Sequence, residues 1–286
     1  MFLPKIGWLG FYQSRPIEGK MKNITVTQKA GKWYASVQVE QEIDIERHPS
    51  QSSIGIDAGI KCFAAFSDGS LVGGPNSFRR HEDALTSEQR KLSRKQKGSE
   101  NWKKQKRKIS RLHHHIADVR MDFLHKLSTD ICKTHATVYV ERLNIRGMSA
   151  SARGTEEAPG RNVRAKSGLN KSILDQGWFE FRRQLDYKLD WMGGRMEQVD
   201  ARHTSQRCSS CGHTEKGNRK SQAEFVCLSC GVEQQADVNA AKNIITVGLT
   251  GMACDLEKAL FAQSNHKSGR KQEPVGNSDG VLPLAS

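Results

Sequence analysis

The stretch Ser53-Ile-Gly-Ile-Asp-Ala-Gly59 decides the fold, because it is a short apolar run interrupted by a single carboxylate, that of Asp57. A run of this kind bounded by serine and glycine is typical of a buried strand. The residues that follow, Lys61-Cys-Phe-Ala-Ala-Phe-Ser67, predict a second strand. Asp68-Gly69 is a hairpin signal, and Leu71-Val72 begins a third strand. Together these segments predict an antiparallel meander with an acid in its first strand.

Two further acids stand at the ends of predicted elements. Thr137-Val-Tyr-Val-Glu141 predicts a buried strand that ends in a carboxylate, and Asp237 opens a predicted helix through about Val247. Each acid has a purely structural alternative: an Asx-type turn for Asp57, a solvated strand end for Glu141 and a helix N-cap for Asp237. Taken together, their positions fit an RNase H-like layout, in which a central mixed sheet presents its acids at one edge.

Clustered carboxylates raise one another's pKa unless divalent cations neutralise them. Hard oxygen ligands from separate elements suit Mg²⁺ or Mn²⁺. Two such ions about 4 Å apart can activate a water and stabilise the leaving 3′ oxygen of a phosphodiester. The three acids therefore predict a catalytic site with two Mg²⁺ or Mn²⁺ ions.

The cysteines predict a second metal site. Cys208-Ser-Ser-Cys211 and Cys227-Leu-Ser-Cys230 are two Cys-x-x-Cys knuckles separated by 15 residues. This spacing lets four thiolates converge on one structural Zn²⁺, with disulfides or free thiols as the alternatives. The ligands would be Cys208, Cys211, Cys227 and Cys230. The other three cysteines, Cys62, Cys132 and Cys254, are interpreted as packing residues rather than nucleophiles.

Composition narrows the class of partner. The chain has 286 residues and a formal net charge of +14. A chain this basic usually meets a polyanion, nucleic acid first and an anionic membrane second. No apolar run approaches the roughly 20 residues needed to span a bilayer, and Pro4, Lys5 and Gly7 interrupt any signal peptide. Seven cysteines without a secretory signal favour a reducing compartment, so a cytoplasmic location and no membrane partner are expected.

Residues 82–134 predict basic helices with a break at Gly98-Ser99. Acids are scarce here, so the cations are expected to be unpaired and to contact phosphates; a solvated helix face is the alternative. The expected nucleic-acid contacts are Lys91, Arg94, Lys95, Lys103, Lys104, Arg107, Lys108 and Arg111. The adjacent histidines 113–115 point in different directions on a helix and are interpreted as solvated.

The remaining segments complete the expected organisation. Ile24-Thr-Val-Thr and Trp33-Tyr-Ala-Ser-Val-Gln-Val-Glu40 alternate at period two around a turn at Lys29-Ala-Gly-Lys32. Two or three strands cannot bury a hydrophobic core alone. These strands are therefore expected to pack on another part of the protein or to belong to a larger β-barrel. Further expectations are a loop over 149–170, one amphipathic helix over 173–191, a strand over 195–200 and a polar, disordered tail from 265.

Several of these stretches, in this order, resemble the TnpB/OrfB proteins of bacterial insertion sequences, relatives of the miniature type V CRISPR nucleases. The matching stretches are Gly55-Ile-Asp-Ala-Gly-Ile60 with Ser67-Asp-Gly69, Val140-Glu-Arg-Leu-Asn-Ile-Arg-Gly-Met148, Lys166-Ser-Gly-Leu-Asn170, Thr204-Ser-Gln-Arg-Cys-Ser-Ser-Cys-Gly-His213, Asn218-Arg-Lys-Ser-Gln222 and Ala236-Asp-Val-Asn-Ala-Ala-Lys-Asn-Ile244. The zinc segment with Asp-Val-Asn-Ala-Ala is highly specific, whereas the Gly-Ile-Asp element alone is weak.

The resemblance implies an α/β, RuvC-like nuclease domain with Asp57, Glu141 and Asp237 as its metal-binding acids, and a zinc ribbon inserted ahead of the third acid. It also implies a guide RNA that pairs with target DNA, since base pairing then reads the sequence. The protein would be bacterial, associating with the nucleoid when bound to DNA. The expected divisions are a partial β-barrel (wedge-like) segment 1–50, a first nuclease part 51–204, a ribbon 205–233, a last nuclease part 234–250 and a tail 251–286.

One departure from the family is the N-terminal part, which is expected to be truncated because Leu3-Pro-Lys-Ile-Gly7 resembles a mid-barrel segment. The function expected from the sequence is RNA-guided DNA cleavage by a transposon-encoded endonuclease, the type often called a transposase. Two alternatives stay open: a nuclease-silent RNA-guided DNA-binding protein or repressor, and an inert transposon relic that merely binds nucleic acid. Oligomeric state, guide and flanking motif are not predicted.

Overall fold

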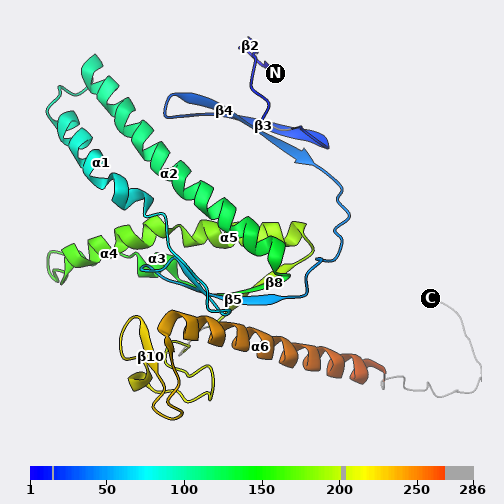
Figure 1. The fold of residues 1–286 in the computed structure, drawn as a ribbon. Coiled ribbons are helices and arrows are strands. Elements are labelled where there is room, and N and C mark those ends of the chain that lie inside the picture. Colours follow the sequence, from blue (N-terminus) through cyan, green and yellow to red (C-terminus); the bar gives the residue numbers. More distant parts are fainter. Residues whose placement is uncertain (15, 201–203, 268–286) are drawn as a thin grey trace, which may run out of the picture.

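A five-stranded mixed sheet forms the centre of the protein (Figure 1), with strand order β7-β6-β5-β8-β9. The computed structural model describes residues 1–14, 16–200 and 204–267, with side chains as far as residue 251. Strands β5 (Ser53–Ala58), β6 (Ala64–Phe66) and β7 (Leu71–Val72) are antiparallel neighbours. Strands β8 (Thr137–Glu141) and β9 (Arg195–Val199) continue the sheet parallel to β5. The predicted meander and both later strands are therefore confirmed.

The two faces of the sheet bury different partners, because successive residues of a strand point to opposite sides. Ile54, Ile56, Val138 and Val140 face the main core. There they join buried residues of helices α2 (Glu100–Thr134) and α5 (Trp178–Trp191). On the opposite face, Tyr139 packs with Val199 and with Ile244 of helix α6 (Ala236–Lys267). The sheet is thus covered by helices on both faces (Figure 1).

Two glycines let α6 lie unusually close to the sheet. A Cβ atom added at Gly55 would overlap the Ala241 carbonyl oxygen, and one added at Gly248 would overlap the Tyr139 ring. Both positions are buried. The close approach matters because α6 begins with the segment that carries Asp237.

The basic region forms a helical hairpin of α1 (Ser77–Ser93) and α2. Helix α1 begins five residues before residue 82, the predicted start of this region. The predicted break is confirmed: Gly98 has a φ of 88°, and the Ser99 side chain accepts a hydrogen bond from the Trp102 amide at 3.2 Å. This is an N-cap, which satisfies one of the free amides at the helix start.

Residues 149–191 differ from the sequence prediction. A short helix α3 (Ile145–Met148) is followed by α4 (Val163–Gln176), so the expected loop 149–170 is wrong over its last eight residues. The single helix expected over 173–191 is also wrong, because Gly177 has a left-handed φ of 74° and separates α4 from α5. The α4 start lacks apolar periodicity and is instead held by polar contacts: Lys166 Nζ donates to Met148 O, and Asn170 Nδ2 donates to Ser149 O at 2.9 Å.

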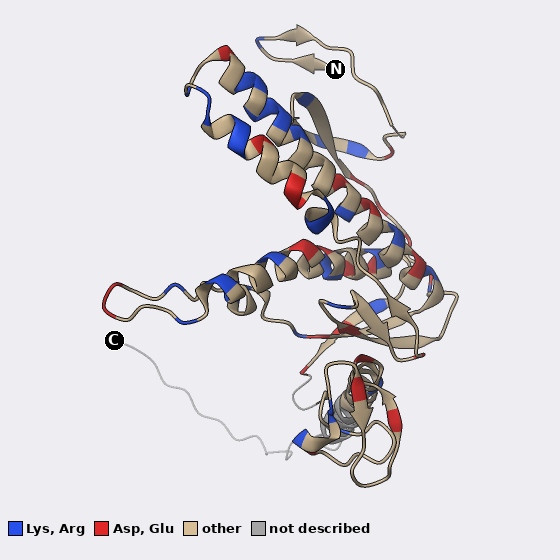
Figure 2. Ribbon diagram, turned by 60° about the vertical axis from the view of Figure 1, so that its left-hand side comes forward, with Lys and Arg blue, Asp and Glu red and all other residues tan. Residues whose placement is uncertain are grey.

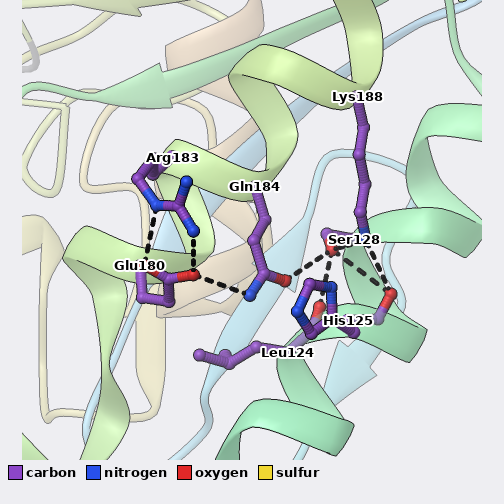
Figure 3. Close-up of polar contacts among 7 residues, drawn as sticks. All are labelled: Leu124, His125, Ser128, Glu180, Arg183, Gln184 and Lys188. Atoms are coloured by element: carbon purple, nitrogen blue, oxygen red, sulfur yellow. Dashed lines mark hydrogen bonds and ion pairs between the residues drawn. The ribbon is translucent and has the colours of Figure 1, made fainter. Parts of the chain in front are cut away.

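A buried polar network joins α2 to α5 (Figure 3). The Lys188 ammonium group donates to three acceptors on α2, at 2.7 to 2.9 Å: Ser128 Oγ, Thr129 Oγ1 and the His125 carbonyl oxygen. Gln184 links Ser128 to Glu180, which in turn binds Arg183 through both carboxylate oxygens. All three Lys188 protons are matched by acceptors, so this buried charge is hydrogen-bonded as buried polar groups require. Burial lowers the pKa of Lys188.

The N-terminal residues form two separate two-stranded sheets. Strands β1 (Phe2–Leu3) and β2 (Gly7–Trp8) make one, and β3 (Lys20–Lys29) and β4 (Lys32–Glu40) make the other. The turn between β3 and β4 places Ala30 and Gly31 at positive φ, which confirms the predicted hairpin. Trp8 and Trp33 are 82% and 69% exposed, so these strands bury little of their apolar surface.

The cysteine segment lies between β9 and α6 in the chain. It contains a 3-10 turn, η1 (Lys216–Asn218), and a hairpin of β10 (Glu224–Val226) and β11 (Glu233–Gln235). Helix α6 then runs to Lys267, so its predicted end near Val247 is wrong and the expected tail 251–286 is helical as far as 267. Residues 253–260 include two alanines and two leucines, which are strong helix formers. The rest of the tail lies outside the described residues. Among the described helices, none has the length and hydropathy of a membrane span.

The two glycines of α6 give a test of the close approach. Gly248→Ala should destabilise the protein by about 1–3 kcal/mol, because a methyl group there overlaps the Tyr139 ring. Gly251→Ala, three residues along the same helix with open space around it, should instead stabilise the protein by about 0.5–1 kcal/mol through helix propensity. Urea denaturation of both variants measures the difference, and equal effects would contradict the close packing of α6 on the sheet.

Candidate functional site

Three carboxylates from distant parts of the chain line one cavity of about 320 Å³. Asp57 lies near the end of β5, Glu141 ends β8, and Asp237 is the second residue of α6. Because β5 and β8 are parallel neighbours, their carboxyl ends meet at one edge of the sheet. Helix α6 begins at this edge. Among the described residues, the cations that line the same cavity are Lys61 and Arg219.

The structural alternatives for Asp57 and Asp237 do not match their surroundings. Asp57 pairs with Ala65 inside the β5–β6 ladder, so it is a strand residue and does not form an Asx-type turn. At the start of α6 the Val238 amide donates to Gln235 Oε1 at 2.7 Å, so Gln235 supplies a capping side chain here. Glu141 is half-buried at its strand end. All three carboxyl groups are thus available to the cavity.

Asp237 is held by two side chains. Arg219 Nη2 lies 3.1 Å from its Oδ1, and Gln235 Nε2 donates to its Oδ2 at 3.2 Å. In the part of the chain that the structure describes, the cysteine quartet alone brings three or more metal-ligand atoms within 4.8 Å of one another. The carboxylates share their cavity at a looser spacing, and Arg219 is paired with Asp237.

The electrostatics of the cavity disfavour three bare carboxylates. Burial, followed by the charges of Asp237 and Glu141, raises the pKa of Asp57 to about 7, although Arg219 acts in the opposite direction. Burial and the charge of Asp200 raise the pKa of Glu141. A cavity that destabilises its own anions is suited to bind cations, because a divalent ion removes the repulsion.

The four cysteines of the two knuckles converge. Cys208 Sγ lies 3.7 Å from Cys230 Sγ, and Cys211 Sγ lies 3.6 Å from Cys227 Sγ. A disulfide has its sulfurs about 2 Å apart, whereas sulfurs bound to one tetrahedral Zn²⁺ at about 2.3 Å are about 3.8 Å apart. All four are free thiols. The thiol spacing fits a tetrahedral metal such as zinc, and the disulfide alternative is wrong.

Two asparagines fasten the cysteine segment to α6, and sequence reasoning assigned them no role. Asn239 Oδ1 accepts from the Ser209 amide at 3.0 Å, while its Nδ2 donates to Arg207 O at 2.8 Å. Asn243, one turn later, donates to Arg207 O and to Thr204 O at 2.7 and 2.8 Å. The spacing of four residues puts both on one helix face. The only sequence signal for these contacts is the asparagine repeated at a spacing of four residues in Asp-Val-Asn-Ala-Ala-Lys-Asn.

The expectation of unpaired cations on the basic hairpin is wrong for three of its eight residues. Lys91 and Lys108 both pair with Glu88, at 2.7 and 3.2 Å, and Lys103 pairs with Glu100 at 2.8 Å. For the other five, Arg94, Lys95, Lys104, Arg107 and Arg111, the structure gives no ion pair within its described residues. Lys and Arg still gather along α1 and α2 (Figure 2), so a cationic surface remains.

The histidines 113–115 are not all solvated as expected. His114 is half-buried; its Nδ1 lies 2.8 Å from Asp118 Oδ2 and its Nε2 lies 3.2 Å from the Tyr34 hydroxyl of β4. The His115 ring meets the His81 ring edge-on at 5.2 Å. The side chain of His114 therefore contacts the N-terminal hairpin, which a helix pattern alone could not reveal.

The cysteines outside the quartet behave as packing residues where they are described. Cys132 is fully buried in the main core, and burial raises its pKa to about 11. Cys62 donates to the carbonyl oxygens of Ala64 and Val72, and burial raises its pKa also. Neither thiol is activated as a nucleophile. The side chain of Cys254 lies outside the described residues.

Two family models match the chain. The model OrfB_IS605, described as "Probable transposase", matches residues 36–152, and the Cas12f1-like TNB domain matches residues 178–244. The second match covers the cysteine segment, Arg219, Asn239 and Asp237. Together the two matched stretches include all three acids of the cavity.

Two curated relatives align along nearly the whole chain. "Putative RNA-guided DNA endonuclease InsQ" of Escherichia coli (strain K12) is 53% identical over 96% of this chain and 67% of its own length. "Putative RNA-guided DNA endonuclease" of Streptomyces pristinaespiralis is 34% identical over 95% of this chain and 65% of its own length. The chain thus spans about two thirds of the length of these relatives.

Among solved structures, "Cryo-EM structure of the Cas12f1-sgRNA-target DNA complex" aligns with 77% of this chain and 55% of that chain, at a TM-score of 0.46 and 20% identity. The sequence matches are the stronger result, because the InsQ relative shares more than half of its aligned residues with this chain. They bear out the resemblance seen in the sequence: the chain belongs to the TnpB/OrfB family of insertion-sequence proteins.

Proposed function

We propose that this chain carries the nuclease centre of an RNA-guided DNA endonuclease, with Asp57, Glu141 and Asp237 as ligands of two Mg²⁺ or Mn²⁺ ions. The observation that supports this most is that three acids, separated by long stretches of sequence, line one cavity. The names of the relatives agree with an endonuclease. The domain around the acids would be of the RuvC type.

The donor set fits hard divalent cations. Carboxylate oxygens are the ligands that Mg²⁺ and Mn²⁺ prefer, and a bound cation would relieve the repulsion from Asp237 and Glu141 that contributes to the raised pKa of Asp57. When bound, such ions generate a hydroxide nucleophile and stabilise the leaving oxygen of a phosphodiester.

The protein's own residues have separate roles in this proposal. Asp57 and Glu141 offer oxygens from the rigid edge of the sheet, which holds them in place. Arg219 and Gln235 fix the orientation of the Asp237 carboxylate. Lys61 is an exposed cation on the rim of the cavity, where it can attract a phosphate.

The cysteine quartet has a structural role, because one Zn²⁺ bound to Cys208, Cys211, Cys227 and Cys230 would fold the ribbon. The ribbon carries Arg219 and is fastened to α6 by Asn239 and Asn243. Zinc would therefore affect the acid cavity indirectly, because the ribbon that it folds carries Arg219, the partner of Asp237.

The chain's partners in this proposal are a guide RNA and a DNA target. The five unpaired cations of the α1–α2 hairpin would contact backbone phosphates, as a protein that leaves sequence reading to base pairing requires. The domain boundaries expected from the sequence at 51, 205 and 234 are retained, so that the ribbon interrupts the nuclease domain.

Replacing Asp57 tests the nuclease centre. Asp57→Asn should lower Mg²⁺-dependent DNA cleavage by about 10³-fold or more, since metal ions supply several kcal/mol of transition-state stabilisation. Nucleic-acid binding should remain. The assay uses purified full-length chain with its co-purifying RNA, and Asp186→Asn, an exposed acid on α5, is the control. Full cleavage by the Asp57 variant would refute the assignment, and wild-type protein that binds but never cleaves would favour a nuclease-silent protein.

The raised pKa of Asp57 predicts a pH effect on metal-free protein. The folded state keeps a proton on Asp57 up to about pH 7 and the unfolded state loses it near 3.8. The stability due to this proton is therefore full below about pH 4 and lost as pH rises through 7. Relative to Asp57→Asn, the wild type should lose up to about 4 kcal/mol over this range. Urea denaturation in EDTA at several pH values measures the loss; parallel pH profiles would contradict it.

Removing one thiolate tests the zinc assignment. Cys208→Ser should release the metal and lower the melting temperature, because binding free energy of a structural zinc is folding free energy. Cys62→Ser, which removes a thiol outside the quartet, should retain one zinc per chain. Zinc content by mass spectrometry and thermal melts are the measurements. A Cys208 variant with full zinc content would rule out this residue as a ligand.

A further inference from the structure

A second polar cavity, of about 400 Å³, lies at the opposite end of the parallel strands from the acids. It forms where residues 47–53, 136–137 and 193–195 meet. Ser53, Thr137 and Arg195 are the first residues of β5, β8 and β9, and they are paired in register across the three strands. Paired residues of parallel strands project to the same face. Two hydroxyls and a guanidinium therefore stand in a row along one wall.

The cavity is held in shape by its main chain. Gly193 has a φ of 69°, and a Cβ there would overlap the Glu46 carbonyl oxygen; a Cβ at Gly194 would lie 2.6 Å from the Ala136 carbonyl oxygen. The segment that leads from β4 into β5 thus lies directly against the turn that precedes β9. The His48 amide donates to the Gly193 carbonyl oxygen at 3.3 Å.

His48 anchors this segment through both nitrogens of its ring. Its buried ring donates from Nε2 to the Cys132 carbonyl oxygen at 2.8 Å, and its Nδ1 accepts from the Ser50 amide at 3.0 Å. The two arginines that line the cavity are Arg47 and Arg195.

The lining is cationic and rich in donors. None of the residues that line the cavity, all of them described, is an acid. Within the described residues, the structure gives Arg47 no ion pair. Arg195 lies 4.0 Å from Glu197 and shares a hydrogen bond with Tyr139, so its guanidinium is positioned at the cavity by its own strand and by β8. A guanidinium fork with nearby hydroxyl donors is the arrangement that binds phosphate.

We infer that this cavity binds a backbone phosphate of a nucleic-acid strand, through Arg47 and Arg195 with Ser53 and Thr137 as hydroxyl donors. A net charge of +14 makes a polyanion the expected source of the phosphate. The site is separate from the acid cavity, shares no lining residue with it and does not depend on metal-assisted cleavage. It would hold a strand at the end of the sheet where the N-terminal hairpin joins the nuclease domain.

The first arm of the test uses inorganic phosphate as the probe. Full-length Asp57→Asn protein with [¹⁵N]glycine is titrated with phosphate against chloride at constant ionic strength. The amide signals of Gly193 and Gly194 should shift and saturate with phosphate. In the double variant Arg47→Ala, Arg195→Ala the shifts should disappear. In the control Lys216→Ala, Lys220→Ala, which removes the same charge from the exposed surface of the ribbon, they should persist.

The second arm identifies the source of the phosphate. Fluorescence anisotropy measures the affinity for a single-stranded oligonucleotide over a series of salt concentrations. Each lost phosphate contact lowers the magnitude of the slope of log K against log salt by about 0.7, so the arginine double variant, which loses one phosphate, should lose about 0.7 from its slope. A charge-preserving variant, Arg47→Lys with Arg195→Lys, should keep most of the slope while weakening the phosphate shifts.

Both arms must succeed for the inference to stand. Absence of saturable phosphate shifts in folded protein, checked by thermal melting of every variant, overturns it. Saturable shifts with an unchanged salt slope also overturn it, because the cavity would then hold free phosphate only. Since both readouts are binding measurements on a cleavage-deficient background, failure here leaves the proposed nuclease centre untouched.

Discussion

The close approach of α6 to the central sheet is the constraint on which the candidate site depends. A helix usually needs side-chain space beneath it, yet Gly55 and Gly248 remove that space at two places along α6. Ile244 then fills the gap between Tyr139 and Val199. With the helix seated this closely, its first turn lies at the sheet edge where β5 and β8 end. The position of Asp237 beside Asp57 therefore follows from packing several residues away.

The cysteine segment extends this dependence beyond the sheet. Asn239 and Asn243 of α6 hydrogen-bond to the main chain around the first Cys-x-x-Cys knuckle of this segment. Arg219, which lies between the two knuckles in the sequence, pairs with Asp237. The orientation of the third acid therefore depends on how the cysteine segment folds. The position of Asp237 thus depends both on the packing of α6 against the sheet and on the contact with Arg219 of the ribbon.

The sequence predicted those parts of the fold whose signals are local. Alternation identified β3 and β4, a short apolar run identified β8, Asp68-Gly69 identified the hairpin after β6, and the cysteine spacing identified the quartet. It failed where one residue overrides a pattern, as Gly177 does between α4 and α5. It also failed where long-range polar contacts decide, as at Lys166 and Arg219. Salt bridges to Glu88 joined cations from two helices, which no single helical pattern contains.

The order of the acids along the chain has a consequence for synthesis. Asp57 and Glu141 leave the ribosome early and sit on paired strands, whereas Asp237 comes after the ribbon in the chain. The cavity cannot be completed until the ribbon has been made and its asparagine contacts to α6 have formed. A nascent chain that already holds its basic helices and two of its acids thus cannot yet bring all three carboxylates into one cavity. Late completion of the cavity separates the folding of the basic hairpin from the assembly of the three carboxylates.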